Sequence, residues 1–202
     1  MESGLPAPRW TMFELFRSKA EAVSAVVHRA STAAAALELV LDVLERERVR
    51  DEPGARAVWC EGPILGRLDR DALSGRVPGL SFEVTRARAA DSRVGVTEFD
   101  WALADTGSLA QDATDPRLRL ASSLTETHVA LVSTGAILPD LASLLARIDP
   151  RRMRYVACVT GPSRTADIER VLTIGVHGPK KLVVIAVDAA VTAAVGAAEE
   201  VR

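Results

Sequence analysis

The chain alternates short apolar runs with longer amphipathic segments, and this alternation constrains its fold more than any other feature. Runs rich in β-branched residues predict strands at 23–28, 55–60, 80–85, 94–97, 128–133, 155–160 and 182–187. Apolar residues at helical spacing predict a short helix capped by Thr11 and helices at 32–49, 64–73, 117–122, 138–148 and 165–174. Short loops join the two kinds of segment, so we expect an α/β fold with a mainly parallel sheet flanked by helices.

The chain is long enough for one domain with a sizeable core, since 48% of its 202 residues are hydrophobic. We expect a flexible arm at 1–10, a single α/β domain at 11–190 and an alanine-rich tail at 191–202. The first residues lack the basic start and apolar stretch of a signal peptide. Asp188 interrupts the most apolar segment, 182–198, which is short for a membrane span. These features predict a soluble, cytoplasmic protein.

Charge and metal-binding residue types narrow the range of functions. A net charge of −2 argues against a strongly basic nucleic-acid binder. The two cysteines, Cys60 and Cys158, lie far apart and form no CxxC motif, so we expect neither a zinc site nor an iron–sulfur cluster in this chain. Both lie in apolar runs, which predicts buried free thiols. The common dinucleotide and nucleoside-triphosphate motifs are absent, so we expect no bound cofactor and no metal.

The first candidate ligand-binding loop begins at Gly161, after a predicted strand. A Gly-Pro turn leads into the helix predicted at 165–174, and ligands of open α/β sheets usually lie beyond the carboxyl ends of strands. The hydroxyls of Ser163 and Thr165 and the guanidinium of Arg164 can bind an anion at such a helix start. The same residues also suit a simple helix cap, in which Arg164 pairs with a nearby acidic residue.

A second candidate loop lies between two short strands predicted at 101–105 and 108–112. It holds one carboxylate, two hydroxyls and a glycine, on Asp105, Thr106, Gly107 and Ser108. These groups can position a substrate, with Asp105 as a base or hydrogen-bond acceptor. The alternative is a tight hairpin in which Asp105 and Thr106 bond to their own backbone.

Three more side chains are candidates for catalysis or its support. Glu98 and Asp100 are two residues apart on a predicted strand, so they share a face and can act together. A solvated strand face explains the same pair. His177 lies in a Gly/Pro loop and can act as a general acid or base near neutral pH, or serve as a structural hydrogen-bonding group.

Several motifs resemble the signatures of the LUD domain, the lactate utilization domain. The segment GVTEFDWALADTGSL at 95–109 resembles the family pattern GIT followed by A-(E/D)-T-G-(S/T)-(L/I). THVALV at 127–132 resembles the family strand THIVVV. TGPSRTADIE at 160–169, followed by GVHGP at 175–179, is similar to the family signature SGPSRTADIE and GVHGP. The last two motifs keep one order and a near-fixed separation, and together the signatures span about 94–188.

The resemblance implies a fold like that of the ribose-5-phosphate isomerase and CoA-transferase group. It also implies participation, with two iron–sulfur partner proteins, in an assembly that oxidises L-lactate to pyruvate. The chain resembles a small stand-alone member without cysteine clusters, so electron transfer is expected to belong to the partners. The family supplies no established catalytic residue, and the candidates are Asp105, His177 and Glu98. The resemblance favours an anion-binding cleft formed by Thr106, Gly107, Ser108, Gly161, Ser163, Arg164 and Thr165.

The chain can be a subunit of a lactate-oxidising assembly, and two alternative functions also remain. By fold analogy, the chain can be an independent enzyme on phosphorylated sugars or thioesters. It can also be a non-catalytic protein that binds a small anion or regulates another protein. The anion we expect is lactate, pyruvate or a phosphorylated compound. Turnover by the isolated chain distinguishes the independent enzyme from the other two functions.

Overall fold

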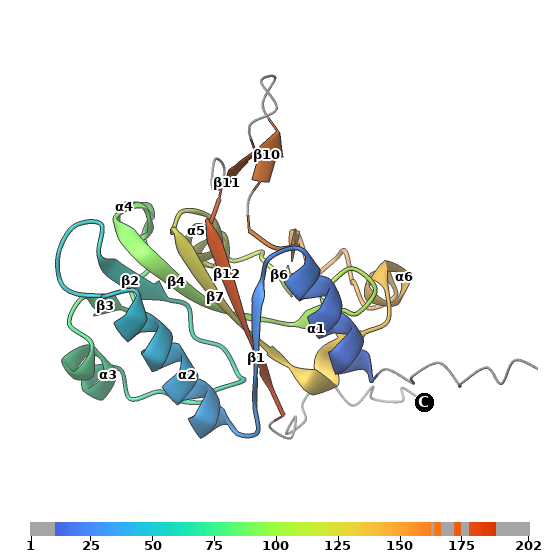
Figure 1. Cartoon of the computed structure of the whole chain (residues 1–202), viewed down its shortest axis with the longest axis horizontal. Helices are drawn as coiled ribbons and strands as arrows, with labels where there is room; N and C mark the ends of the chain where they lie inside the picture. Colours follow the sequence, from blue (N-terminus) through green and yellow to red (C-terminus); the bar gives the residue numbers. More distant parts are fainter. Residues whose placement is uncertain (1–10, 163, 167–171, 175–177, 189–202) are drawn as a thin grey trace, which may run out of the picture.

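Six parallel strands form the centre of the fold (Figure 1). The computed structural model describes residues 11–162 and 178–188, and the backbone of 164–166 and 172–174. In spatial order the strands are β1 (Val26–Ala30), β12 (Lys181–Val187), β7 (Thr127–Ser133), β4 (Ser92–Phe99), β2 (Arg56–Trp59) and β3 (Leu80–Ser81). Each neighbouring pair runs parallel, which confirms the predicted parallel sheet.

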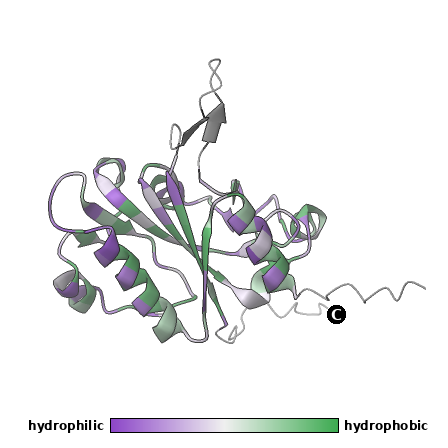
Figure 2. Cartoon of the chain, in the orientation of Figure 1, coloured by the Kyte–Doolittle hydropathy of each residue, from purple (hydrophilic) through white to green (hydrophobic). Residues whose placement is uncertain are grey.

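One face of this sheet is covered by α2 (Ala33–Arg46) and α3 (Arg70–Arg76). Val40 and Leu44 of α2 are buried against alternate strand residues such as Val129. Figure 2 shows the strands as hydrophobic along most of their length and α2 as two-coloured, with a hydrophilic side. The apolar stripe of α2 therefore faces the sheet, as its helical spacing predicts.

The opposite face carries α1 (Met12–Ala22), α4 (Arg86–Ala90) and α5 (Pro116–Ser123). Phe16 of α1 is fully buried against strand residues such as Val184. Helices thus flank the sheet on both sides, and the predicted fold class is confirmed. The sequence pattern gave no indication of α4, whose five residues follow an N-cap at Thr85.

A smaller, four-stranded sheet packs on the same side as α1. In spatial order its strands are β8 (Ile137–Leu138), β5 (Trp101–Leu103), β6 (Ser108–Asp112) and β9 (Val156–Val159). The 3-10 turn η1 (Thr134–Ala136) joins β7 to β8, and α6 (Leu141–Leu145) packs on the outer face of this sheet. β5 and β6 are the two short strands predicted around Gly107, and they pair antiparallel.

Helix starts follow from local side-chain chemistry. Thr11 accepts the N–H of Glu14, whose carboxylate accepts the N–H of Thr11, so the two residues form a capping box. Thr32 caps α2 by accepting the N–H of Ala35 at 3.1 Å. The helices predicted from Thr11 and from 32 are therefore confirmed, although α2 ends at Arg46.

The helix predicted at 165–174 is wrong. The described backbone forms β10 (Arg164–Ala166) and β11 (Leu172–Ile174), which pair antiparallel as a two-stranded sheet. β-branched Thr165 and Thr173 favour extended backbone, and this preference accounts for the strands better than helical spacing does. Figure 1 shows this hairpin standing out from the body of the molecule.

The apolar strand predicted at 155–160 lies at the edge of a sheet. β9 is the outer strand of the smaller sheet, and Tyr155 before it is 52% exposed. Cys158 is exposed, which corrects the prediction of two buried thiols. Cys60 is half-buried, and burial raises the pKa of its thiol to about 11. An apolar run in an edge strand is therefore no evidence of burial on both sides.

Other strands and helices begin or end at different residues from those predicted. The strand predicted at 80–85 is reduced to the two residues of β3, and the helix predicted at 64–73 begins only at Arg70. The helix predicted at 138–148 is the shorter α6. In the described part of the chain, no helix combines the length and the apolar character needed to cross a membrane.

Candidate functional site

The two loops predicted to bind a ligand come together where β6 pairs with β9. Leu109 lies opposite Val159 in this antiparallel pair, so the residues just outside it are neighbours. The hydroxyl oxygens of Ser108 and Thr160 are 2.5 Å apart and share a hydrogen bond. Residues 52 positions apart in the sequence are thus joined at the edge of the candidate site.

Two glycines allow these loops to lie very close to the end of α1. Gly107 and Gly161 have φ values of +69° and +70°, in the left-handed region that favours glycine. A Cβ at Gly107 would overlap the backbone of Ala20, and a Cβ at Gly161 would lie 2.6 Å from the carbonyl oxygen of Val23. Only glycine allows both the turn and the close approach at these positions.

The loop at 104–108 has the backbone of a tight hairpin turn. The N–H of Gly107 donates to the carbonyl of Leu103 at 2.9 Å, and the N–H of Asp105 donates to the carbonyl of Pro139 at 3.1 Å. Asp105 and Thr106 are exposed at the tip, whereas Ser108 is buried. The turn therefore presents one carboxylate and one hydroxyl to solvent.

Arg164 and Thr165 lie in β10, where the structure describes their backbone. Ser163 and His177 lie outside the described residues. Figure 1 shows β10 and β11 at the end of the molecule where β12 begins. The parallel strands of the six-stranded sheet have their amino ends there. The loop was predicted to follow a carboxyl end of the main sheet, but β9, the strand before it, belongs to the smaller sheet.

Glu98 lies near the carboxyl end of β4, and its hydrogen bonds go to a different part of the chain from these two loops. Its carboxylate accepts the backbone N–H of Ile64 at 2.6 Å and of Leu65 at 3.2 Å. Burial raises the pKa of Glu98 above its ordinary value, while these backbone donors oppose the rise. A Cβ at Gly62 would overlap the carboxylate, so a side chain there would displace Glu98 from its present position. Glu98 therefore holds the loop after β2 in place.

Asp100 does not act together with Glu98. Its carboxylate accepts the backbone N–H of Asp112 at 2.7 Å and so ties the start of β5 to the end of β6. The prediction that the two carboxylates form a pair is not supported by these contacts. The interpretation of a simple solvated face also fails for Glu98, because its side chain is buried.

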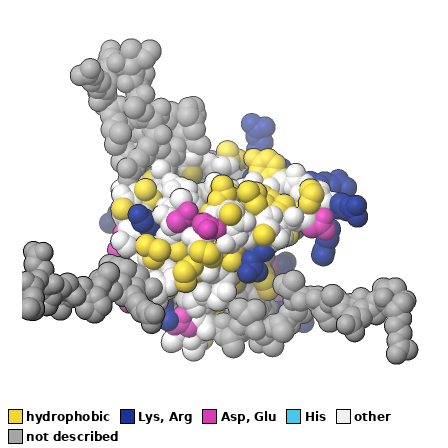
Figure 3. Space-filling model, turned by 90° about the vertical axis from the view of Figure 1, so that its right-hand side faces the viewer, with side chains coloured by type: hydrophobic (Ala, Val, Ile, Leu, Met, Phe, Trp, Pro, Cys, Tyr) yellow, Lys and Arg dark blue, Asp and Glu magenta, His cyan; other side chains and the backbone are white. Residues whose placement is uncertain are grey.

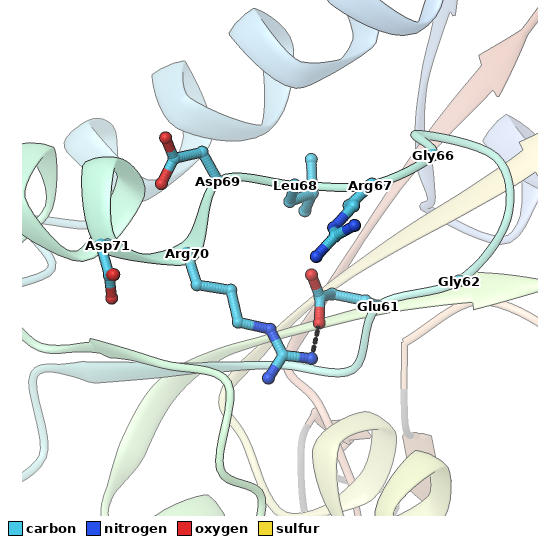
Figure 4. A pocket seen from close by; sticks show the side chains of 8 residues that line it. All are labelled: Glu61, Gly62, Gly66, Arg67, Leu68, Asp69, Arg70 and Asp71. Carbon is cyan, nitrogen blue, oxygen red and sulfur yellow. Dashed lines mark hydrogen bonds and ion pairs between the residues drawn. The ribbon is translucent and has the colours of Figure 1, made fainter.

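A pocket of about 900 Å³ lies beside the loop that Glu98 holds (Figure 4). Arg70 reaches Glu61 across it and forms an ion pair. Its lining residues are Glu61, Gly62, Gly66, Arg67, Leu68, Asp69, Arg70 and Asp71. Acidic and basic side chains both line the pocket, so it has no single charge preference. No motif in the sequence indicated this pocket.

A buried polar pair on two neighbouring strands of the main sheet, β7 and β4, was also missed. Nε2 of His128 lies 2.9 Å from the hydroxyl of Thr97, and the histidine is fully buried. Burial lowers the pKa of His128 to about 3, so the ring stays neutral at physiological pH. Its Nδ1 has no hydrogen-bond partner in the part of the chain that is described. A histidine inside an apolar strand gives no sequence signal of such a contact.

Metal ligands do not gather among the described residues. No group of three or more His, Cys, Asp or Glu side chains in them has the arrangement needed to hold a metal ion. The polar groups that the structure does bring together near the two candidate loops are hydroxyls and a carboxylate. Such groups are suited to hydrogen bonding with a small polar ligand.

Comparison with known proteins gives one family. The sequence model of the LUD domain matches residues 13–187. A "Lactate utilization protein C" from Exiguobacterium sp. is 33% identical over 106 residues, which cover 50% of this chain and 46% of the relative. The protein of the same name from Geobacillus kaustophilus is 28% identical over 156 residues, which cover 74% of this chain and 58% of the relative. The matched part spans about half the length of such relatives.

Among solved structures, the fold resembles the crystal structure of a DUF162 family protein from Deinococcus radiodurans. The TM-score is 0.62, and the match covers 90% of this chain and 99% of that one. Sequence identity is 18%, so this likeness concerns the fold.

Proposed function

The chain belongs to the LUD domain family, and from this premise we propose that it takes part in lactate utilization, as a component of an assembly that oxidises L-lactate to pyruvate. The family match over 13–187, together with relatives named for lactate utilization, carries this proposal. Iron–sulfur partner proteins would carry the electrons, because this chain has only two cysteines and a cluster commonly needs four.

We place a small anion, lactate or pyruvate, at the loops 104–108 and 161–165. Three observations support this location. Ser108 and Thr160 join the loops, Asp105 and Thr106 are exposed at the turn, and both loops lie within the family motifs. Arg164 would supply the positive charge, since a guanidinium binds a carboxylate through two parallel hydrogen bonds. Ser163 and Thr165 would add hydroxyl donors.

Calorimetric titration of the purified chain tests the anion site. L-lactate, pyruvate and inorganic phosphate are the probes, and Arg164→Ala is the test variant. Loss of a charge-assisted bond of about 1.5–3 kcal/mol predicts an affinity at least about tenfold weaker. Arg86→Ala, on exposed α4, is the matched control and should bind like the wild type. Equal affinity of Arg164→Ala and wild type for every probe would exclude the site.

Isolation from the native cell tests the assembly. A tagged chain should bring down proteins with iron–sulfur absorbance, and the isolated assembly should reduce an artificial electron acceptor with L-lactate. The chain alone should show no such turnover. Conversion of a phosphorylated sugar or a thioester by the chain alone would instead support an independent enzyme.

A further inference from the structure

The outer edge of β9 is unpaired among the residues that the structure describes. Within the described part of the chain, β9 pairs only with β6. The N–H of Ala113 donates to the carbonyl of Tyr155 at 2.8 Å. In an antiparallel pair, successive residues alternately bond to the partner strand and point their N–H and C=O groups away from it, so this bond shows which residues of β9 face β6. The backbone groups of Val156 and Cys158 therefore point away from β6, and no described residue bonds them. Such a row of free N–H and C=O groups is a template for one more strand.

The four residues of β9 itself, VACV, include no charged side chain and no proline at the edge. Large exposed hydrophobic side chains lie nearby in sequence: Leu141 and Leu145 of α6 are 50% and 59% exposed, and Tyr155 is 52% exposed. Figure 3 shows hydrophobic side chains spread over the right-hand side of the molecule, with basic side chains crowded at one margin. This combination is typical of an interaction surface.

Several arginines that precede β9 in the sequence form no ion pair with a described residue. Nine arginines of the described chain form ion pairs, among them Arg56 with Asp51 and Asp91. No ion pair with a described residue is made by the scattered Arg48, Arg67, Arg86 and Arg93, nor by the four arginines that lie together between α6 and β9, namely Arg147, Arg151, Arg152 and Arg154. The acidic residue among them is Asp149, which accepts the backbone N–H of Arg151.

A fifth arginine extends the cluster. The guanidinium of Arg119 lies 4.4 Å from the ring centroid of Tyr155 and donates to the carbonyl of Ala113. No described carboxylate pairs with it. The segment before β9 therefore carries more basic than acidic side chains, with Asp149 within it and Asp112 of β6 opposite Val156, although the whole chain carries a net charge of −2.

We propose that the open edge of β9 binds an extended, acidic segment of a partner protein, which adds as a fifth strand to the smaller sheet. The free backbone groups of Val156 and Cys158 require an extended occupant. The arginines between α6 and β9 require carboxylates on it. A second copy of this chain, paired antiparallel through β9, would bring its uncharged residues 159–162 opposite these arginines, so charge favours a different protein. The proposal does not rest on the anion site, although β9 runs directly into the loop at 161–165.

A labelled peptide tests this directly. The probe is a fluorescein-labelled peptide that alternates Glu and Val, titrated into the full chain and followed by fluorescence anisotropy. We expect saturable binding that weakens about tenfold or more at high salt, because screening removes the attraction between exposed charges. The same peptide with Lys in place of Glu should not bind. Equal binding of the two peptides would overturn the proposal.

Variants separate the charge contribution from the backbone contribution. Arg151→Glu combined with Arg152→Glu should weaken peptide binding about tenfold or more, and Arg86→Glu on α4 should leave it unchanged. Val156→Pro removes an outward N–H and no bond to β6, so it should abolish peptide binding in a folded chain. A peptide N-methylated at alternate residues repeats this test without changing the protein.

Two further outcomes decide against the proposal. Undiminished binding of the N-methylated peptide would show that no strand is added. A chain that forms a concentration-dependent dimer through β9, disrupted by Val156→Pro and indifferent to the acidic peptide, would identify a second copy as the occupant. Light scattering coupled to size-exclusion chromatography measures the dimer.

Discussion

The hydroxyls of Ser108 and Thr160 share a hydrogen bond across 2.5 Å, and this contact joins two loops that lie far apart in the sequence. Ser108 is buried, while Thr160 lies at the exposed end of β9. The bond therefore couples the turn between β5 and β6 to the beginning of the loop that carries Arg164. Any ligand that contacts both loops meets surfaces already fixed relative to each other.

Removal of either hydroxyl should reveal this coupling. Ser108→Ala and Thr160→Val should each lower the free energy of unfolding, by about 0.5–1.5 kcal/mol, the net contribution of one such bond. The double variant should cost less than the sum of the two, since both remove the same bond. Urea denaturation of the wild type, the two single variants and the double variant measures the free energies of this double-mutant cycle. Thr106→Ala, at an exposed position of the same turn, is the control, and strict additivity would show that the bond contributes nothing.

Gly107 should not tolerate a side chain. Gly107→Ala adds a left-handed φ penalty of about 1–2 kcal/mol and an overlap with the backbone of Ala20, for a total loss of about 3 kcal/mol or more. Gly66→Ala is the matched control, because its φ is +70° and no atom lies within 4 Å of the added Cβ. It should cost only the φ penalty. Similar losses in thermal or urea unfolding would mean that α1 does not press on Gly107.

Glu98 should make the protein less stable as the pH rises through the carboxyl range. Its pKa is raised in the folded chain, so between the ordinary value of 4.5 and the raised value the folded chain holds more protons than the unfolded chain. Stability is thus highest below this window and falls as the carboxyl ionises, by about 1.4 kcal/mol for each unit of pKa rise. Glu98→Gln should remove this slope, as measured by urea midpoints across pH. An unchanged slope would assign the pH dependence to other groups.

His128 acts in the opposite sense. Its pKa of about 3 lies below the ordinary 6.5, so the unfolded chain takes up a proton that the folded chain excludes. Stability is fully present above pH 6.5 and is lost as the pH falls toward 3, by on the order of 5 kcal/mol. His128→Gln should be less stable at neutral pH and should show a shallower loss in acid. Acid titrations followed by circular dichroism compare the two, with Thr97→Val as the control that keeps the imidazole.

The parts of the fold that could be predicted from the sequence are those that local chemistry dictates. Thr11 and Thr32 cap their helices wherever the chain goes next, and a fully buried strand such as β12 must be apolar on both faces. The loop at 104–108 was predicted for the same reason, because a glycine between two short apolar runs indicates a turn.

The rest depended on partners that are distant in the sequence. β9 is as apolar as a central strand, and only its position at the edge of the smaller sheet leaves Cys158 exposed. Glu98 has the spacing of a solvated strand residue, yet the loop after β2 closes over it with two N–H donors. His128 receives its partner from the neighbouring strand β4. Such contacts arise from the order of the strands in space, which no local pattern fixes.

The strand order also determines when the chain can complete its fold. β12, nearly the last segment of the described chain, lies between β1 and β7 and pairs with both over their full length. Until the ribosome has released residues 181–187, the first strand has no neighbour in the sheet, and two long edges stay open. A newly made chain must therefore remain partly unfolded until residues 181–187 have left the ribosome. In that interval its exposed apolar strands and unpaired edges make aggregation most favourable.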